Sequence, residues 1–309
     1  MRGRVQRLLR VSRNALDLVR AMSFYRDALG FSLVSERPMD DPAWSELMGL
    51  PGTGGRSAIL QLGEQTLELV AFDPLGRAYP SQSRASDHWF QHLAIVVADM
   101  EAAYANLCRH FFTTITTGGP QQLPPNAGSV TALKFRDPVG HPLELLHFPS
   151  GGSDARWQQK RGGHDVFLGI DHSAITVADI TESIDFYTCL LGFQVAARSL
   201  NSGPEQAHLD NAPGVRVEVV ALQPEQAGPP HLELLGYERP AGHPIPAGVK
   251  AHDLLADRLI LEVDDLPSLA QAIEGEGIEF ISPGIVTLRD GHRAALLRDP
   301  TGHMLMLYE

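Results

Sequence analysis

The sequence predicts an α+β chain of four βαβββ units arranged as two tandem halves, and three observations support this. Motifs of the first half recur in the second at a constant offset, so that Phe24-Tyr25 returns as Phe186-Tyr187. Asp137-Pro138, before an apolar segment, returns in the same way as Asp299-Pro300. Ala-rich helical segments alternate with β-branched segments throughout, a pattern typical of α+β folds. Matches this regular indicate an internal duplication.

The division of the chain follows from these repeats. Residues 150–165 are rich in Gly and charged residues and lack hydrophobic periodicity, so we expect them to link the halves. The first half, 1–149, holds two units, and the second half, 166–309, holds two more. The four units are expected at residues 4–74, 88–149, 166–240 and 254–309.

The second unit illustrates the expected order of elements. An apolar strand at 92–98 precedes Asp99, which is a suitable N-cap for a helix reaching about Arg109. The strands expected after this helix lie at residues 111–117, 130–135 and 142–148. The first strand of the first unit is expected within the opening segment, residues 1–12.

Two further local signals recur between the halves. In the third unit, Asp179 and Glu182 have the spacing of a capping box at the start of a helix. The segments 42–52 and 204–214 occupy matching places, and each is expected to form a short helix. Such a helix would either close over a cavity mouth or pack on the sheet.

Composition excludes several classes of partner and leaves a small molecule as the expected one. The chain has 309 residues, of which 43% are hydrophobic, and a net charge of −12, which argues against nucleic acid or an anionic membrane surface. No apolar run is long enough to cross a bilayer, and no cleavable signal stands at the start, so we expect a cytoplasmic protein. Cys108 and Cys189 are expected to be buried thiols in a reducing compartment. Both a monomer and a homodimer remain open.

The motifs together resemble those of the vicinal oxygen chelate superfamily. Phe-Tyr lies in a helix of each half, Leu-Gly-Phe follows it, and Asp-Pro-x-Gly-His precedes a last strand. That superfamily includes glyoxalase I, bleomycin resistance proteins and extradiol dioxygenases. The resemblance implies that units pair to form curved, half-barrel sheets that enclose cavities. It also implies a metal held by one residue from the first strand and one from the last strand of each paired unit.

Carried over position by position, the resemblance assigns a pair of residues to each unit. The pairs are Arg10 and Glu68, His92 and Glu144, His172 and Glu233, and Arg258 and Met306. Arginine stays protonated and cannot be a ligand, and the thioether of Met306 is a poor ligand for a hard divalent ion. The second and third units are therefore complete, whereas the first and fourth are degenerate.

The distribution of these residues bears on how the units pair. Pairing in sequence order would impair both cavities. Crossed pairing of the second unit with the third, and of the first with the fourth, leaves one intact metal site and one degenerate site. We favour the crossed pairing, because the loss of one ligand removes the need for the others in the same cavity. Glu68 is then expected to form an ion pair with Arg10 or Arg258.

The resemblance implies one divalent metal ion, and the donors suit Zn, Ni, Co, Mn or Fe. It further implies a lyase or isomerase of the glyoxalase I type, in which a proton next to a carbonyl is removed and the metal stabilises the enediolate. Glu144 and Glu233 are equivalent candidates for the base. The alternatives are an extradiol ring-cleaving dioxygenase using Fe(II) and a metal-free protein that binds a small molecule. The identity of the substrate, and whether it includes a thiol, is left open.

Weaker expectations concern the lining of the cavity. Strand alternation places His231 and Tyr237 on the face of Glu233, and Thr176 on the face of His172. His231 could support a ligand or face solvent. Arg216, with Arg198, is an expected contact for an anionic group of the substrate.

Overall fold

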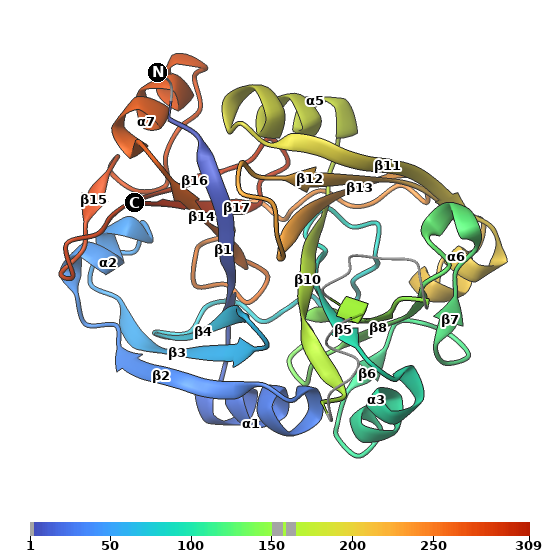
Figure 1. Ribbon diagram of the computed structural model, residues 1–309. Helices are drawn as coiled ribbons and strands as arrows, with labels where there is room; N and C mark the ends of the chain where they lie inside the picture. The colour runs from blue at the N-terminus through green and yellow to red at the C-terminus, as the bar shows by residue number, and fades with distance from the viewer. Residues whose placement is uncertain (1–2, 150–156, 159–164) are drawn as a thin grey trace.

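The computed structural model describes residues 3–149, 157–158 and 165–309, and in this part of the chain the strands form two curved, open sheets (Figure 1). Sheet A has the strand order β15-β16-β17-β14-β1-β4-β3-β2. Sheet B has the order β11-β12-β13-β10-β5-β9-β8-β6, with β7 paired to β8. The predicted linker, 150–165, lies outside the described residues apart from Trp157, Gln158 and Asp165. The expected α+β class is confirmed.

Sheet A is built from the first and fourth units. The first unit consists of β1 (Val5–Asn14), α1 (Leu18–Leu29), β2 (Ser32–Pro38), α2 (Pro42–Leu47), β3 (Gly54–Leu62) and β4 (Gln65–Asp73). The fourth consists of β14 (Arg258–Val263), α7 (Leu266–Gly275), β15 (Val286–Thr287), β16 (Arg293–Arg298) and β17 (Met304–Tyr308). The antiparallel contact of β1 with β14, where Ser12 faces Arg258, joins them.

Sheet B is built from the second and third units. The second consists of β5 (Gln91–Val97), α3 (Met100–Leu107), β6 (Thr113–Thr114), β7 (Gln121–Gln122), η1 (Pro125–Ala127), β8 (Thr131–Arg136) and β9 (Pro142–His147). The third consists of β10 (Phe167–Thr176), α5 (Ile180–Asp185), the π-helical η2 (Phe186–Leu190), β11 (Gln194–Ser202), α6 (Pro204–Asp210), β12 (Arg216–Gln223) and β13 (His231–Arg239). Antiparallel pairing of β5 with β10 places His92 opposite Ala174. The crossed pairing of units is thus confirmed.

The repeated sequence motifs hold the two units of each half together. The hydroxyl of Tyr25 in α1 donates to Asp137, which follows β8 in the second unit. The hydroxyl of Tyr187 in η2 donates to Asp299, which follows β16 in the fourth unit. Each aspartate also accepts hydrogen bonds from backbone amides of its own turn. The Phe-Tyr and Asp-Pro-x-Gly-His motifs are therefore two ends of one buried contact, which both halves repeat.

The helices begin where the sequence predicts them. Asp99 accepts from the amides of Glu101 and Ala102, and Asp179 accepts from those of Thr181 and Glu182, as N-caps do. The apolar faces of α1, α3, α5 and α7 contribute to one hydrophobic core shared by all four units; in Figure 1, α1 and α3 lie along the lower edge of the molecule and α5 and α7 along the upper edge. This shared core holds the two sheets together.

Two expectations about local structure are wrong. Cys108 and Cys189 are exposed, because each stands next to, and not on, the apolar stripe of its helix. The strand expected at 111–117 is reduced to Thr113 and Thr114, although the amides of Ile115 and Thr116 still donate to the carbonyl of Lys134 in β8. None of the helices in the described residues is both long and apolar enough to span a membrane.

Candidate metal centre

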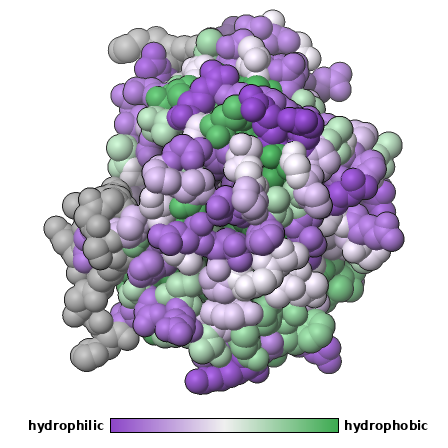
Figure 2. All heavy atoms as spheres, turned by 90° about the vertical axis from the view of Figure 1, so that its right-hand side faces the viewer, coloured by the Kyte–Doolittle hydropathy of each residue, from purple (hydrophilic) through white to green (hydrophobic). Residues whose placement is uncertain are grey.

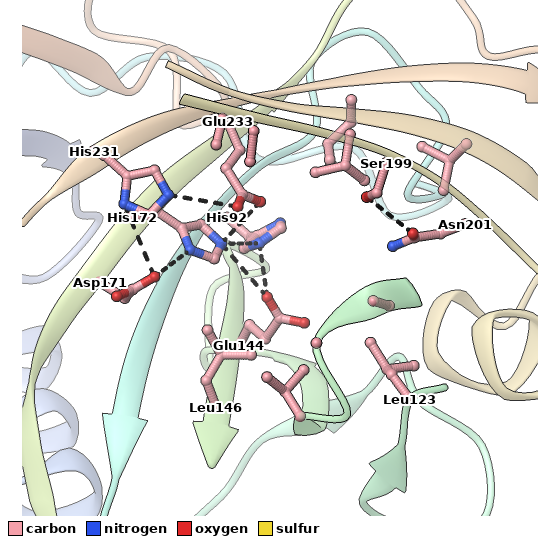
Figure 3. Close-up of a pocket in the computed structure, with 18 of the residues that line it drawn as sticks. His92, Leu123, Glu144, Leu146, Asp171, His172, Ser199, Asn201, His231 and Glu233 are labelled. Atoms are coloured by element: carbon pink, nitrogen blue, oxygen red, sulfur yellow. Dashed lines mark hydrogen bonds and ion pairs between the residues drawn. The ribbon is translucent and has the colours of Figure 1, made fainter. Parts of the chain in front are cut away.

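Four side chains of metal-ligand type meet on the concave face of sheet B (Figure 3). They come from β5, β9, β10 and β13, which are neighbours in the sheet. Nε2 of His92 lies 3.0 Å from Oε2 of Glu144, and Nε2 of His172 lies 3.7 Å from the same oxygen. Nε2 of His172 also lies 3.5 Å from Oε2 of Glu233. The structure therefore brings together all four residues that the sequence singles out as metal ligands, two from each half.

The chemistry and spacing of these donors fit a divalent transition metal. Nε2 of His92 and Nε2 of His172 are 3.4 Å apart. Two imidazole nitrogens bound to one tetrahedral ion, at about 2.0–2.1 Å each, would lie about 3.4 Å apart. His92, Glu144 and His172 offer donor atoms that all lie within 4.8 Å of one another, and all three are buried. A set of two imidazoles and two carboxylates suits several first-row metals.

Asp171 and His231 form a second group beside these ligands. Nδ1 of His172 lies 3.0 Å from Oδ2 of Asp171. An ionised carboxylate can only accept, so Nδ1 carries the proton and Nε2 is left to face the other ligands. His231 lies opposite His172 on the neighbouring strand, and its Nε2 is 3.5 Å from Oε1 of Glu233. Asp171 thus contacts the ligand residue on the first strand of the third unit, His172, and His231 contacts the one on its last strand, Glu233.

The electrostatics of the group reflect burial opposed by close charges. Burial lowers the pKa of His172, but the neighbouring carboxylates, led by that of Glu233, outweigh burial and raise it to about 9. Burial raises the pKa of Glu233, but His172 and His231 outweigh burial and lower it to about 2. Burial lowers the pKa of His92, and Glu144, the one carboxylate that opposes this effect, does not outweigh it. Without a metal, His172 is therefore an imidazolium held by carboxylates.

The ligands lie at one end of a cavity of about 650 Å³. Its walls are largely apolar, and its other end carries the polar side chains of Ser199 and Asn201 (Figure 3). The outer face around α3 and α6 is mainly hydrophilic, with hydrophobic residues visible between polar ones (Figure 2). The volume is that of a pocket for a small organic molecule.

A buried polar cluster forms another part of the cavity wall. Nζ of Lys134 on β8 lies 2.7 Å from Oδ1 of Asp210 at the end of α6. Gln206 and the hydroxyl of Tyr237 donate to the other oxygen of Asp210, at 2.8 and 2.9 Å. This cluster ties α6 of the third unit to the sheet of the second unit. The short helix expected at 204–214 therefore does lie over the cavity.

The weaker expectations about the lining have mixed outcomes. His231, Tyr237 and Arg198 line the cavity. Thr176 does not line it, because its hydroxyl donates to the carbonyl of Ala85 at 2.8 Å and the side chain is buried under the segment that joins the first two units. Arg216 does not line it either, because it pairs with Glu238 at the surface.

The matching place in sheet A is filled with hydrophobic side chains. Trp44 of α2 stacks on Phe72 with 5.0 Å between ring centroids, and both pack in one cluster with Met306. The guanidinium of Arg258 lies 5.5 Å from the ring centre of Phe72 and donates to Ser12, Asn14, Ala251 and Ala256. Of the four residues expected at this place, Met306 is therefore part of a hydrophobic cluster, and Arg258 is held beside it by hydrogen bonds.

The prediction that Glu68 forms an ion pair with Arg10 or Arg258 is wrong. Glu68 lies 4.0 Å from Nη2 of Arg37 on the edge strand β2. It makes no ion pair with Arg10 or Arg258 within 4.0 Å in the described part of the chain. Arg258 finds its partners on β1 and in the segment before β14, so Glu68 turns toward the rim of the sheet.

Sequence reasoning missed Asp171, Lys134 and Asp210. Neighbours on a regular strand point to opposite faces, so strand alternation gives no reason to place Asp171 beside the ring of His172. The register of β10 against β5 shifts between Ile170 and His172, and this irregularity turns Asp171 toward the histidine ring. The one sequence feature that points to Asp171 is its place as a charged residue next to His172 in an otherwise apolar strand. No local signal identifies the pairing of Lys134 with Asp210.

The model of the Glyoxalase/Bleomycin resistance protein/Dioxygenase superfamily matches residues 7–145 and 169–307. The chain belongs to this superfamily, and each match covers one tandem half. A curated relative, the uncharacterized protein YwbC of Bacillus subtilis, is 28% identical over 142 residues, which are 45% of this chain and 96% of the relative.

Solved structures show the same fold along the whole chain. Glyoxalase I from Zea mays matches 98% of this chain and 92% of its own, with 18% identity and a TM-score of 0.60. A putative dioxygenase from Bacillus subtilis matches 99% of this chain and 85% of its own, with 14% identity and a TM-score of 0.58. At these identities the likeness concerns the fold, and the reaction has to be argued from the site.

Proposed function

We propose that the protein is a metal-dependent lyase or isomerase of the glyoxalase I type, acting on a small molecule by removing a proton next to a carbonyl group. The observation that carries this proposal is the convergence of His92, Glu144, His172 and Glu233 at one end of a cavity. Two imidazoles and two carboxylates that converge in this way form a donor set suited to one divalent ion.

The same four residues would hold one divalent ion. Such an ion, when bound, supplies Lewis-acid stabilisation of the negative charge that develops on an oxygen beside the deprotonated carbon. Asp171 keeps the proton of His172 on Nδ1, so that Nε2 is the atom turned to the site. His92, Glu144 and His172 are themselves buried, so the charge interactions among them are stronger than they would be in water.

The two glutamates differ in how firmly they are held. Glu144 contacts both ligand histidines, at 3.0 and 3.7 Å, and its side chain is 6% exposed. Glu233 has no contact as short as 3.0 Å: it lies 3.5 Å from His172 and 3.5 Å from His231, and its side chain is 20% exposed. Glu233 is therefore better placed to leave its neighbours and accept the substrate proton.

Metal analysis of the purified protein tests the site. We expect about one equivalent of a divalent metal in the wild type and a large loss in both His92→Ala and His172→Ala. Glu68→Gln is the matched control, because Glu68 is the counterpart of Glu233 in the hydrophobically filled sheet A. Retention of the metal in either histidine variant would show that the two halves do not share one site.

Proton exchange tests the reaction. Hemithioacetals of 2-oxoaldehydes with small thiols are offered in D₂O, and NMR follows deuterium entering the carbon next to the carbonyl. We expect incorporation that depends on the metal and on Glu233. Ring cleavage of catechols without any such exchange would contradict the proposal.

One observation favours an extradiol dioxygenase as a second candidate. His92, His172 and Glu144 form the tightest group, and Glu233 lies further out, which resembles the two-histidine, one-carboxylate arrangement of non-haem Fe(II) oxygenases. Loading the protein with Fe(II) under anaerobic conditions and then adding catechol and oxygen separates the two candidates, because only the dioxygenase consumes oxygen.

A further inference from the structure

Asp171 uses both of its carboxylate oxygens, and they connect two different parts of the chain. Oδ2 accepts from Nδ1 of His172 at 3.0 Å. Oδ1 accepts from Nε1 of Trp157 at 2.9 Å. Trp157 belongs to the segment between the halves and lies outside both family matches. One hydrogen-bonded chain therefore runs from the connecting segment to a ligand-type histidine.

Trp157 is held far more tightly than a residue of a connecting segment needs to be. It is 1% exposed and packs with Val96 of β5 and Leu168 of β10. A Cβ atom at Gly169 would lie only 2.9 Å from the indole ring, so the ring rests directly on the backbone of β10. The indole is thus fixed against the two strands that carry His92 and His172.

His92 and His172 differ in whether their Nδ1 atoms have a hydrogen-bond partner. Nδ1 of His92 has no hydrogen-bond partner among the described residues, whereas Nδ1 of His172 has Asp171. Sheet A offers an internal comparison, because the same register irregularity occurs in β1 at Leu9. There the counterpart of Asp171 is Leu9, and the counterpart of His172 is Arg10. Of these two matching positions, the one in β10 has both the histidine and the neighbouring carboxylate, and the one in β1 has neither.

We propose that Trp157 and Asp171 form a positioning relay, which fixes the ring of His172 and so sets the metal affinity of the site from the segment that connects the halves. This inference rests on the proposed metal site. A partner that holds the second nitrogen of a ligand histidine fixes its tautomer and its orientation. Asp171 and Trp157 are positioning residues, since they act through His172.

Two substitutions test the relay by titration with Co²⁺, followed by competition with a chromophoric chelator. Asp171→Asn keeps a single amide oxygen for two donors, so we expect affinity to fall by about 10- to 100-fold. Trp157→Phe removes only the indole N–H, and we expect a loss of about threefold or more. The d–d absorption of bound Co²⁺ should also shift in both variants, because the imidazole turns relative to the ion.

Trp89→Phe is the matched control. Nε1 of Trp89 donates to Oγ of Ser83 at 2.9 Å, and neither residue lines the cavity, so this variant loses an equivalent hydrogen bond without contacting Asp171 or His172. Its Co²⁺ affinity and spectrum should equal those of the wild type. If Trp157→Phe and Asp171→Asn also equal the wild type, the relay is refuted while the metal site stands.

A wild type that binds no Co²⁺ would refute the proposed function, and the hydrogen bonds can then be tested in the metal-free protein. NMR should show a downfield Nδ1 proton that disappears in His172→Asn and moves in Trp157→Phe but not in Trp89→Phe. Absence of such a resonance, or its indifference to Trp157→Phe, would overturn the relay.

Discussion

The metal-free protein should lose stability as the pH rises through about 9, and His172→Asn should remove most of that loss. Burial disfavours the charged ring, but Glu233, Asp171 and Glu144 together raise the pKa of His172 from 6.5 to about 9. A group whose pKa is raised by folding stabilises the fold fully below its unfolded value, and that contribution is lost as the pH passes the folded value. At about 1.4 kcal/mol per pKa unit, the contribution is about 3 kcal/mol.

Urea unfolding of chelator-treated protein at pH 6 and pH 10 measures this contribution. The difference in the free energy of unfolding between wild type and His172→Asn should be about 3 kcal/mol smaller at pH 10 than at pH 6. Groups that titrate in both proteins cancel in that difference. An exposed histidine of sheet A, His292, provides the control, and His292→Asn should keep the pH profile of the wild type. A difference between wild type and His172→Asn that stays constant from pH 6 to pH 10 would refute the electrostatic account of the site.

Three further outcomes are expected. Apparent Co²⁺ affinity should rise by up to about tenfold per pH unit below pH 9, because the ion must displace the proton of His172, whose pKa is about 9; competition titrations across pH measure the slope. Glu233→Gln should retain most of the metal but slow deuterium incorporation by about 10²- to 10⁴-fold, whereas Glu144→Gln should lose the metal itself; metal analysis and NMR exchange separate these results. Trp44→Ala should cost about 3–5 kcal/mol in urea unfolding and leave Co²⁺ affinity unchanged, because Trp44 fills the cavity of sheet A; weaker Co²⁺ binding in this variant would mean that the two sheets are coupled.

The positions of the metal-type ligands could be predicted because they are tied to local landmarks. His92 and His172 each stand seven residues before an aspartate that caps a helix. The glutamates follow from a place in the last strand of their units. The pairing of the units could be predicted from the concerted loss of ligands in the first and fourth units. Both predictions rest on spacings that can be read directly from a single sequence.

Other features depend on irregular backbone or on distant contacts, which a sequence does not reveal directly. Asp171 reaches His172 only because β10 departs from regular register. Thr176 lies an even number of residues from His172 on the strand, as predicted, but its hydroxyl donates to the carbonyl of Ala85, which is distant in sequence. Lys134 meets Asp210 across two units of different halves. Predictions failed where alternation along a strand was taken to be perfect, or where the partner lay far away in sequence.

The crossing of units between sheets has a consequence for symmetry. A chain of two units could build both sheets only by associating with a second copy of itself, and the two-fold axis would then make its two cavities identical. Any substitution in such a homodimer changes both cavities at once. When two copies are fused into one chain, each cavity can vary separately. Fusion thus permits one cavity to gain hydrophobic packing while the other keeps its polar residues, a division of labour that an isologous dimer cannot reach.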